Sequence, residues 1–236
     1  MIENLPSYIS VVFGLTTLAT LVLFYSAIKG ARTNSSKAIP IAIVLILWLM
    51  LQAALTLTNF YNTDTTSFPP KFLLLILPPV VVILTLFGTK KGRRFIDGLP
   101  LIKLTNLNIV RIPVELVLYW LFLNKAVPEL MTFAGRNFDI LAGITAPFIA
   151  YIGLRRQKLG RKAILAWNFI ALGLLLNIVI NAILSAPFTI QKFAFDQPNI
   201  AVLNFPFSWL PAFIVPVVLF GHLVSIRQLL RMDFKV

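Results

Sequence analysis

The sequence predicts an all-α polytopic membrane protein, a bundle of seven transmembrane helices with the N-terminus outside and the C-terminus in the cytoplasm. Three observations lead to this fold class. The chain is apolar and poor in charge, and its apolar residues fall into seven long runs. Its basic residues gather in alternate connections between those runs.

The composition is typical of an integral membrane protein. Hydrophobic residues make up 58% of the chain, charged residues only 12%, and the mean hydropathy is +0.89. Soluble domains carry about 25% charged residues. The fifteen prolines also fit lipid-embedded helices, where neighbouring groups satisfy the carbonyls that a proline frees.

The first three apolar runs cover residues 8–28, 39–60 and 71–88. A bilayer core of about 30 Å requires about 20 apolar residues per helix, and the first two runs reach that length. The third is short and contains Pro78-Pro79. We therefore expect a kink in the third helix or an extension past these limits.

The remaining runs cover residues 105–124, 138–154, 163–185 and 207–229. The run 138–154 is short and contains Pro147, whereas the other three are long enough to span. Together the runs predict seven transmembrane helices.

The orientation follows from the basic residues of the connections. Sixteen Lys and Arg lie in four connections, 29–38, 89–104, 155–162 and 227–236. The N-terminus and the three other connections hold four. The positive-inside rule places the richer group in the cytoplasm, and the strict alternation requires an odd number of spans.

The connections are short, so we expect one domain over residues 1–236, in a bacterial inner membrane. The net charge of +13 sits in clusters between apolar runs, which indicates the lipid bilayer as the partner and no nucleic acid. The chain has no cysteine and one histidine. Cys-ligated metals, a multi-histidine zinc site and a bis-His haem are therefore excluded, and no cofactor is predicted.

Arg111 and Glu115 are the main candidates for a functional site. They lie deep in the fourth run, and their i,i+4 spacing places them on one helix face where they can pair. Ionisable groups at such depth are costly and mark functional sites. Either Arg111 binds an anionic group or Glu115 carries a proton; the alternatives are a self-neutralised structural pair and an Arg111 that snorkels to the interface.

The sixth run carries a stripe of small and polar residues at four-residue intervals, Gly173, Asn177, Asn181 and Ser185. Such a stripe is expected to face protein or water. It indicates close helix packing, with asparagine side chains bonding across helices, or the lining of a ligand site with Asn177 and Asn181 as its members.

Polar residues also gather at the predicted outer ends of the second and fifth runs. Gln52 and Asn59 belong to a stripe that opens outward, and Arg136, Asn137 and Asp139 precede the fifth helix. We interpret Gln52, Asn59, Arg136 and Asp139 as ligand-binding candidates. The alternative for the group before the fifth helix is interface charges and helix capping by Asn137 or Asp139.

His222 lies in the last run, about two turns from its cytoplasmic end. A histidine can exchange a proton near physiological pH. It is a candidate for the same site, and a hydrogen-bonded packing residue is the alternative.

These groups favour a transporter or a membrane protein that binds a small polar, anionic or lipid ligand. One alternative is an accessory subunit whose polar residues serve packing within the chain or in a homo- or hetero-oligomer. The other is an intramembrane enzyme that acts on a lipid or isoprenoid, with Glu115, Asp139 or His222 as acid or base. The sequence contains no Gly-rich phosphate loop, so we expect no coupling to ATP within this chain, and no Gly-x-Ser-x-Gly elbow supports a serine nucleophile. We leave an enzymatic role open and favour a non-enzymatic one.

Overall fold

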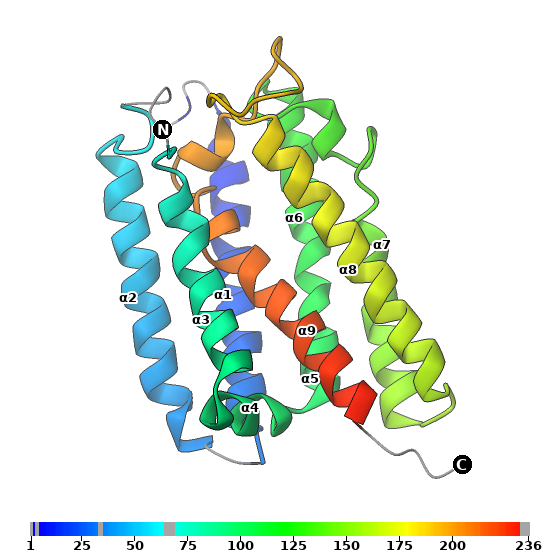
Figure 1. Ribbon diagram of the computed structural model, residues 1–236. Helices are drawn as coiled ribbons and strands as arrows, with labels where there is room; N and C mark the ends of the chain where they lie inside the picture. The colour runs from blue at the N-terminus through cyan, green and yellow to red at the C-terminus, as the bar shows by residue number, and fades with distance from the viewer. Residues whose placement is uncertain (1, 3–4, 33–34, 64–68, 232–236) are drawn as a thin grey trace.

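The computed structural model describes residues 2, 5–32, 35–63 and 69–231, and within these ranges the chain is helical and contains no strand. A helix lies at each of the seven predicted apolar runs (Figure 1). Five helices are long and apolar enough to cross a membrane, or six if a sharply bent pair counts as one span. The finding supports a helical membrane protein, whereas seven spans and their orientation stay predictions.

The first part of the chain forms α1 (Ser7–Lys29), the short 3₁₀ turn η1 (Ser35–Lys37) and α2 (Ala38–Leu57). The buried face of α1 contains three threonines, at positions 16, 17 and 20, whose hydroxyls donate to carbonyls four residues earlier. These polar groups are thus satisfied within the helix and can face the apolar interior.

The third run forms α3 (Leu73–Gly88), and α4 (Lys90–Asp97) follows after a bend of 93°. The kink predicted from Pro78-Pro79 is not where the chain turns. It turns at Thr89, whose extended backbone ends α3 and whose hydroxyl accepts from the Gly92 amide at 3.1 Å, which caps α4.

The fourth run is a continuous span, Leu101–Leu123, made of α5 (Leu101–Asn106), the 3₁₀ turn η2 (Leu107–Val110) and α6 (Arg111–Leu123). After the 3₁₀ turn η3 (Glu129–Met131) the fifth run forms α7 (Ile140–Phe148) and a π-helical segment, η4 (Ile149–Arg155). The stretch Ile140–Arg155 is apolar but shorter than a membrane span.

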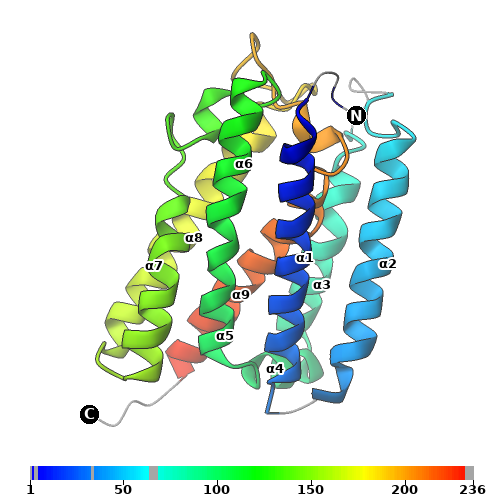
Figure 2. The same ribbon diagram turned by 180° about the vertical axis from the view of Figure 1, so that it is seen from behind.

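The last third of the chain contains α8 (Arg161–Leu184), the 3₁₀ turn η5 (Ala201–Leu203), the π-helical segment η6 (Leu210–Ile214) and α9 (Val215–Arg231). In Figures 1 and 2, α9 crosses the middle of the bundle, with α8 on one side and α1 and α3 on the other. In the most apolar part of the span Leu210–Arg231, which joins η6 and α9, 67% of residues are buried, against 17% for Ser35–Leu57 and 28% for α8. The centre of the molecule therefore lies around α9 and α5–α6.

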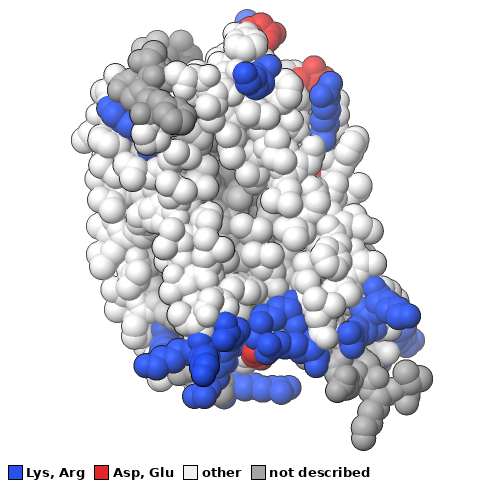
Figure 3. Space-filling view, in the orientation of Figure 1, with Lys and Arg blue, Asp and Glu red and all other residues white. Residues whose placement is uncertain are grey.

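The surface has the character expected in a membrane. Large apolar side chains are exposed on several helices, including Val22, Val44, Leu84 and Ile170 at 64–65% exposure. Figure 3 shows a broad uncharged band on the visible face, with Lys and Arg gathered below it. This end of the bundle, where α4 lies and α9 finishes, is called the basic end (Figure 1).

Candidate functional site

The centre of the candidate site is a buried ion pair between α6 and α7. Arg111, the first residue of α6, places its Nε 3.2 Å from Oδ2 of Asp139, and the two side chains are 3% and 6% exposed. Asp139 immediately precedes α7. Because the guanidinium is buried, Arg111 does not snorkel to the interface.

Close approach of α6 and α7 brings this pair together. Gly143 lies one turn into α7, and a Cβ added there would stand 2.9 Å from Cγ1 of Ile112 and 3.2 Å from Cβ of Arg111. Glycine therefore permits a helix separation that a larger residue would oppose. The same separation sets the distance between Arg111 and Asp139.

Glu115 lies one turn beyond Arg111 and is 1% exposed. Its carboxylate accepts a hydrogen bond from Nδ2 of Asn137, whose Oδ1 accepts from the backbone amide of Asp139 at 3.0 Å. Asn137 thus connects the Glu115 carboxylate to the backbone of Asp139. The i,i+4 spacing predicts Glu115 as the ion-pair partner of Arg111, whereas the partner in the structure is Asp139.

Arg111, Glu115 and Asp139 line one small cavity of about 30 Å³, together with apolar side chains of α6, α8, η6 and α9. This is space for a water-sized guest and not for a sugar or an amino acid. Nη2 of Arg111 donates to the carbonyl of Ala171 on α8 at 3.1 Å. Nη1 of Arg111, Oε2 of Glu115 and Oδ1 of Asp139 are buried without a hydrogen-bond partner among the described residues.

His222 of α9 is fully buried and contacts α8. Its Nδ1 lies 3.0 Å from Oδ1 of Asn168, whose Nδ2 donates to the carbonyl of Ile164. Because Oδ1 is an acceptor, Nδ1 carries the proton and Nε2 is an acceptor, which has no partner within the described chain. Asn168 was not among the predicted site residues, and His222 does not line the cavity.

The stripe on α8 does not form one buried face. Gly173 and Asn177 are exposed, whereas Asn181 and Ser185 are buried. Nδ2 of Asn177 donates to the backbone carbonyl of Arg136 at 2.9 Å, and Nδ2 of Asn181 donates to Oδ1 of Asn177. The first half of the stripe therefore lies on the surface of the chain and the second half lies in its interior, and the expectation that the whole stripe faces protein or water stays a prediction.

The other predicted residues lie away from the charged centre. Gln52 is buried and its Oε1 accepts from the Tyr61 hydroxyl, in a second polar cluster where Thr56 donates to Oγ of Ser208 at 2.9 Å. Asn59 is exposed and lies in the turn after α2 with a positive φ of 57°. The Arg136 side chain is also exposed.

The apolar helices and the buried charged centre define a helical membrane protein with an ionisable site in its interior. The chain belongs to a family described as a domain of unknown function, DUF8737, whose profile matches residues 68–230. The matched segment contains Arg111, Glu115, Asp139 and His222 but not α1 or α2. Comparison with curated proteins and with solved structures gives no significant match.

Proposed function

We propose that the protein is a proton-coupled transporter of the bacterial inner membrane, with seven spans, the N-terminus outside and the C-terminus in the cytoplasm. Support for seven spans comes from the helices at all seven apolar runs. Two of these spans would be irregular: α3 and α4 form a sharply bent pair, and Ile140–Arg155 is shorter than a regular span. Support for the orientation comes from the sequence, which has sixteen basic residues in four alternate connections and four in the others. Short connections and the lack of cysteine favour the inner membrane.

The observation that carries the proposal is the charge balance of the buried centre. Two carboxylates, Glu115 and Asp139, surround one guanidinium, Arg111, in a cavity of about 30 Å³. With both carboxylates ionised the centre holds an unpaired negative charge, which is costly in so enclosed a place. One bound proton removes that charge, so the two carboxylates together hold one exchangeable proton.

Proton binding and release then change the electrostatics between α6 and α7. With the proton bound the centre is neutral, and without it Arg111 is shared by two anions. Two π-helical segments adjoin these helices: η6 supplies Leu210 and Ile214 to the cavity wall, and η4 continues α7. Such segments often occur at functional sites, because their hydrogen-bond pattern permits local rearrangement. We propose that this movement admits the transported ligand, a small polar or anionic solute.

Replacing Glu115 with glutamine tests the proposal. Glu115→Gln keeps the shape and an acceptor for Asn137, but leaves Asp139 and Arg111 neutral without a proton. In proteoliposomes with an internal pH dye and a mixture of small polar and anionic solutes outside, a potassium diffusion potential should drive proton uptake by the wild type and not by Glu115→Gln. The infrared band of a protonated carboxylic acid should be lost in the same variant.

Glu129→Gln is the matched control, because Glu129 is an exposed carboxylate of η3. It should retain both the proton flux and the infrared band. A wild type that moves no more protons than empty liposomes, with a band that Glu115→Gln leaves unchanged, would show the proposal to be wrong.

A second candidate is an accessory subunit of a homo- or hetero-oligomeric complex. The favouring observation is the outward face of α8, where a Cβ at Gly173 would meet no atom within 4 Å and Asn177 is exposed. Small and polar residues on a lipid-facing surface permit close approach of another helix. In that case Gly173→Leu, on the outward face of α8, would disturb assembly, whereas Glu115→Gln would not.

A further inference from the structure

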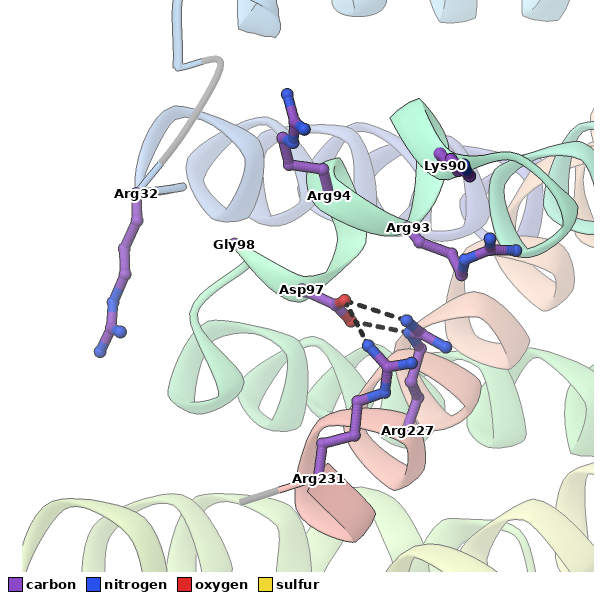
Figure 4. A pocket seen from close by; sticks show the side chains of 8 residues that line it. All are labelled: Arg32, Lys90, Arg93, Arg94, Asp97, Gly98, Arg227 and Arg231. Atoms are coloured by element: carbon purple, nitrogen blue, oxygen red, sulfur yellow. Dashed lines mark hydrogen bonds and ion pairs between the residues drawn. The ribbon is translucent and has the colours of Figure 1, made fainter. Parts of the chain in front are cut away.

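A second charged region lies at the basic end, separate from the buried centre. It is a cleft of about 470 Å³ that faces outward between α4, the end of α9 and the chain that follows α1. Its lining residues are Arg32, Lys90, Arg93, Arg94, Asp97, Gly98, Arg227 and Arg231 (Figure 4). Six cations thus surround one carboxylate.

The cleft is built by packing that fixes its three walls. The bend after α3 turns α4 across the bundle, with Phe95 and Ile96 buried and Lys90 and Arg94 exposed. Nε2 of Gln228 on α9 donates to the carbonyls of Ile96 and Leu99 at 2.7 and 2.9 Å. The amide of Arg32 donates to the carbonyl of Gly98 at 2.9 Å, which secures the third wall.

The cations of the cleft differ in how far they are already engaged. Asp97 accepts from Nε and Nη2 of Arg227 at 2.7 and 3.0 Å and from Nη1 of Arg231 at 3.1 Å. Nη1 of Arg93 donates to the last carbonyls of α3. The side chains of Arg32, Lys90 and Arg94 make no hydrogen bond or ion pair with the residues that the structure describes. Donors are therefore left over on both sides of the cleft.

Membrane orientation by itself does not account for this arrangement. The positive-inside rule depends on how many basic residues a connection carries and not on their convergence. The stretch 155–162 satisfies that rule with exposed residues such as Lys158 and Lys162, which are not among the residues that line this cleft. Convergence of six cations on one concavity requires a further reason, and an anionic ligand supplies one.

We propose that this cleft binds the phosphate group of an anionic ligand, either an anionic phospholipid headgroup or a soluble phosphate ester. Guanidinium groups match phosphate oxygens with paired hydrogen bonds, and Lys90 adds a mobile positive charge. The volume lies within the range of small-ligand sites. Amphipathic helices with an outward basic face, like that of α4, lie at the level of the lipid headgroups. Basic pockets between helices bind such headgroups.

Binding of defined phosphate compounds tests the proposal. Protein purified in a non-ionic detergent is titrated with short-chain phosphatidylglycerol, short-chain phosphatidylcholine or glycerol 3-phosphate, and adducts are counted by native mass spectrometry. Lys90→Ala/Arg94→Ala removes two cations without disturbing the Asp97 ion pairs. We expect a discrete phosphatidylglycerol or glycerol 3-phosphate adduct whose affinity falls at least about tenfold in this variant.

The matched control is Lys158→Ala/Lys162→Ala, which removes the same charge from the same end outside the cleft. It should bind like the wild type, and phosphatidylcholine, which has no net charge, should bind weakly to all three proteins. A phosphatidylglycerol adduct that is sensitive to the cleft variant identifies a lipid ligand, and a glycerol 3-phosphate adduct identifies a soluble one.

Two results would overturn the proposal. One is the absence of a discrete adduct with any of the three compounds. The other is an equal loss of binding in the two double variants, which would show an effect of overall surface charge. If Lys90→Ala/Arg94→Ala fails to fold, the single variant Arg32→Gln, on the opposite wall, replaces it with the same expected outcomes.

Discussion

The two charged regions of this molecule differ in charge balance and in exposure to solvent. The buried centre has one cation, Arg111, and two carboxylates in about 30 Å³, with side chains of the ion pair only 3% and 6% exposed. The cleft at the basic end has six cations and one carboxylate around about 470 Å³, and its Arg231 side chain is 60% exposed. Charge is scarce and paired in the first region, and in excess in the second.

The difference follows from the solvent around each region. A charge removed from water loses several kcal/mol of hydration, so in the interior each ionised group needs a partner or a proton. At the membrane surface water and lipid headgroups solvate the charge, and an excess of one sign costs little. The same residue types therefore hold the fold together in one region and remain free for ligands in the other.

Removing one cation from each region should give the largest difference in the free energy of unfolding. Arg111→Met leaves Asp139 and Glu115 buried without a counter-charge, and we expect a loss of about 3–5 kcal/mol in the free energy of unfolding. Arg227→Met breaks an ion pair that water reaches, and the expected loss is below about 1 kcal/mol. Chemical unfolding in detergent micelles measures both.

The double variant Arg111→Met/Asp139→Asn is the control for this prediction. It removes the anion that Arg111→Met leaves unpaired, so it should recover part of the lost stability. If Arg111→Met costs no more than Arg227→Met, the buried centre is better hydrated than the structure indicates, and the contrast between the regions fails.

Helix spacing in the buried centre should matter less than charge, but measurably. Gly143→Ala adds a Cβ 2.9 Å from Cγ1 of Ile112, so either Ile112 shifts or α7 moves away from α6 and weakens the ion pair. The expected loss in the free energy of unfolding is about 1–3 kcal/mol. Gly14→Ala in α1, where the new Cβ meets no atom within 4 Å, should not destabilise the protein. Equal effects of the two substitutions would contradict the tight packing described for α6 and α7.

The positions of the helices were predictable, because hydropathy records burial in lipid directly. The predicted run 8–28 lies within α1 (Ser7–Lys29), and 163–185 agrees with α8 (Arg161–Leu184) to within two residues. The bend at Thr89 was not predicted. An extended residue between two helices does not change the hydropathy pattern. The kink was predicted at Pro78-Pro79, whereas the sharp bend follows α3.

The partners within the site were less predictable, because sequence spacing describes one helix at a time. The i,i+4 rule selects Glu115 for Arg111, whereas the ion pair crosses from α6 to Asp139 before α7. The stripe on α8 does not form one buried face, and the reason is geometric. Steps of four residues overshoot a turn of 3.6 by about 40°, so after three steps the stripe has rotated by about 120°. Gly173 is therefore exposed and Ser185 is buried.

The smallest expected effect is the pH dependence of the ion pairs at the basic end. The hydrogen bonds from Arg227, followed by the nearby charges of the cleft, hold the pKa of Asp97 below its usual value. A lowered folded-state pKa means that the stabilisation is complete above the unfolded pKa of about 4 and is lost as the pH falls through the folded value. The difference in the free energy of unfolding between the wild type and Asp97→Asn, measured by chemical unfolding at each pH, should therefore be constant from neutral pH to about pH 5. It should shrink at more acid pH, by less than about 1 kcal/mol because water reaches the pair. Asp196→Asn, which removes an exposed carboxylate between α8 and η5, should match the wild type at neutral pH. A difference for Asp97→Asn that does not change down to pH 3 would show that the ion pairs with Arg227 and Arg231 add nothing to stability.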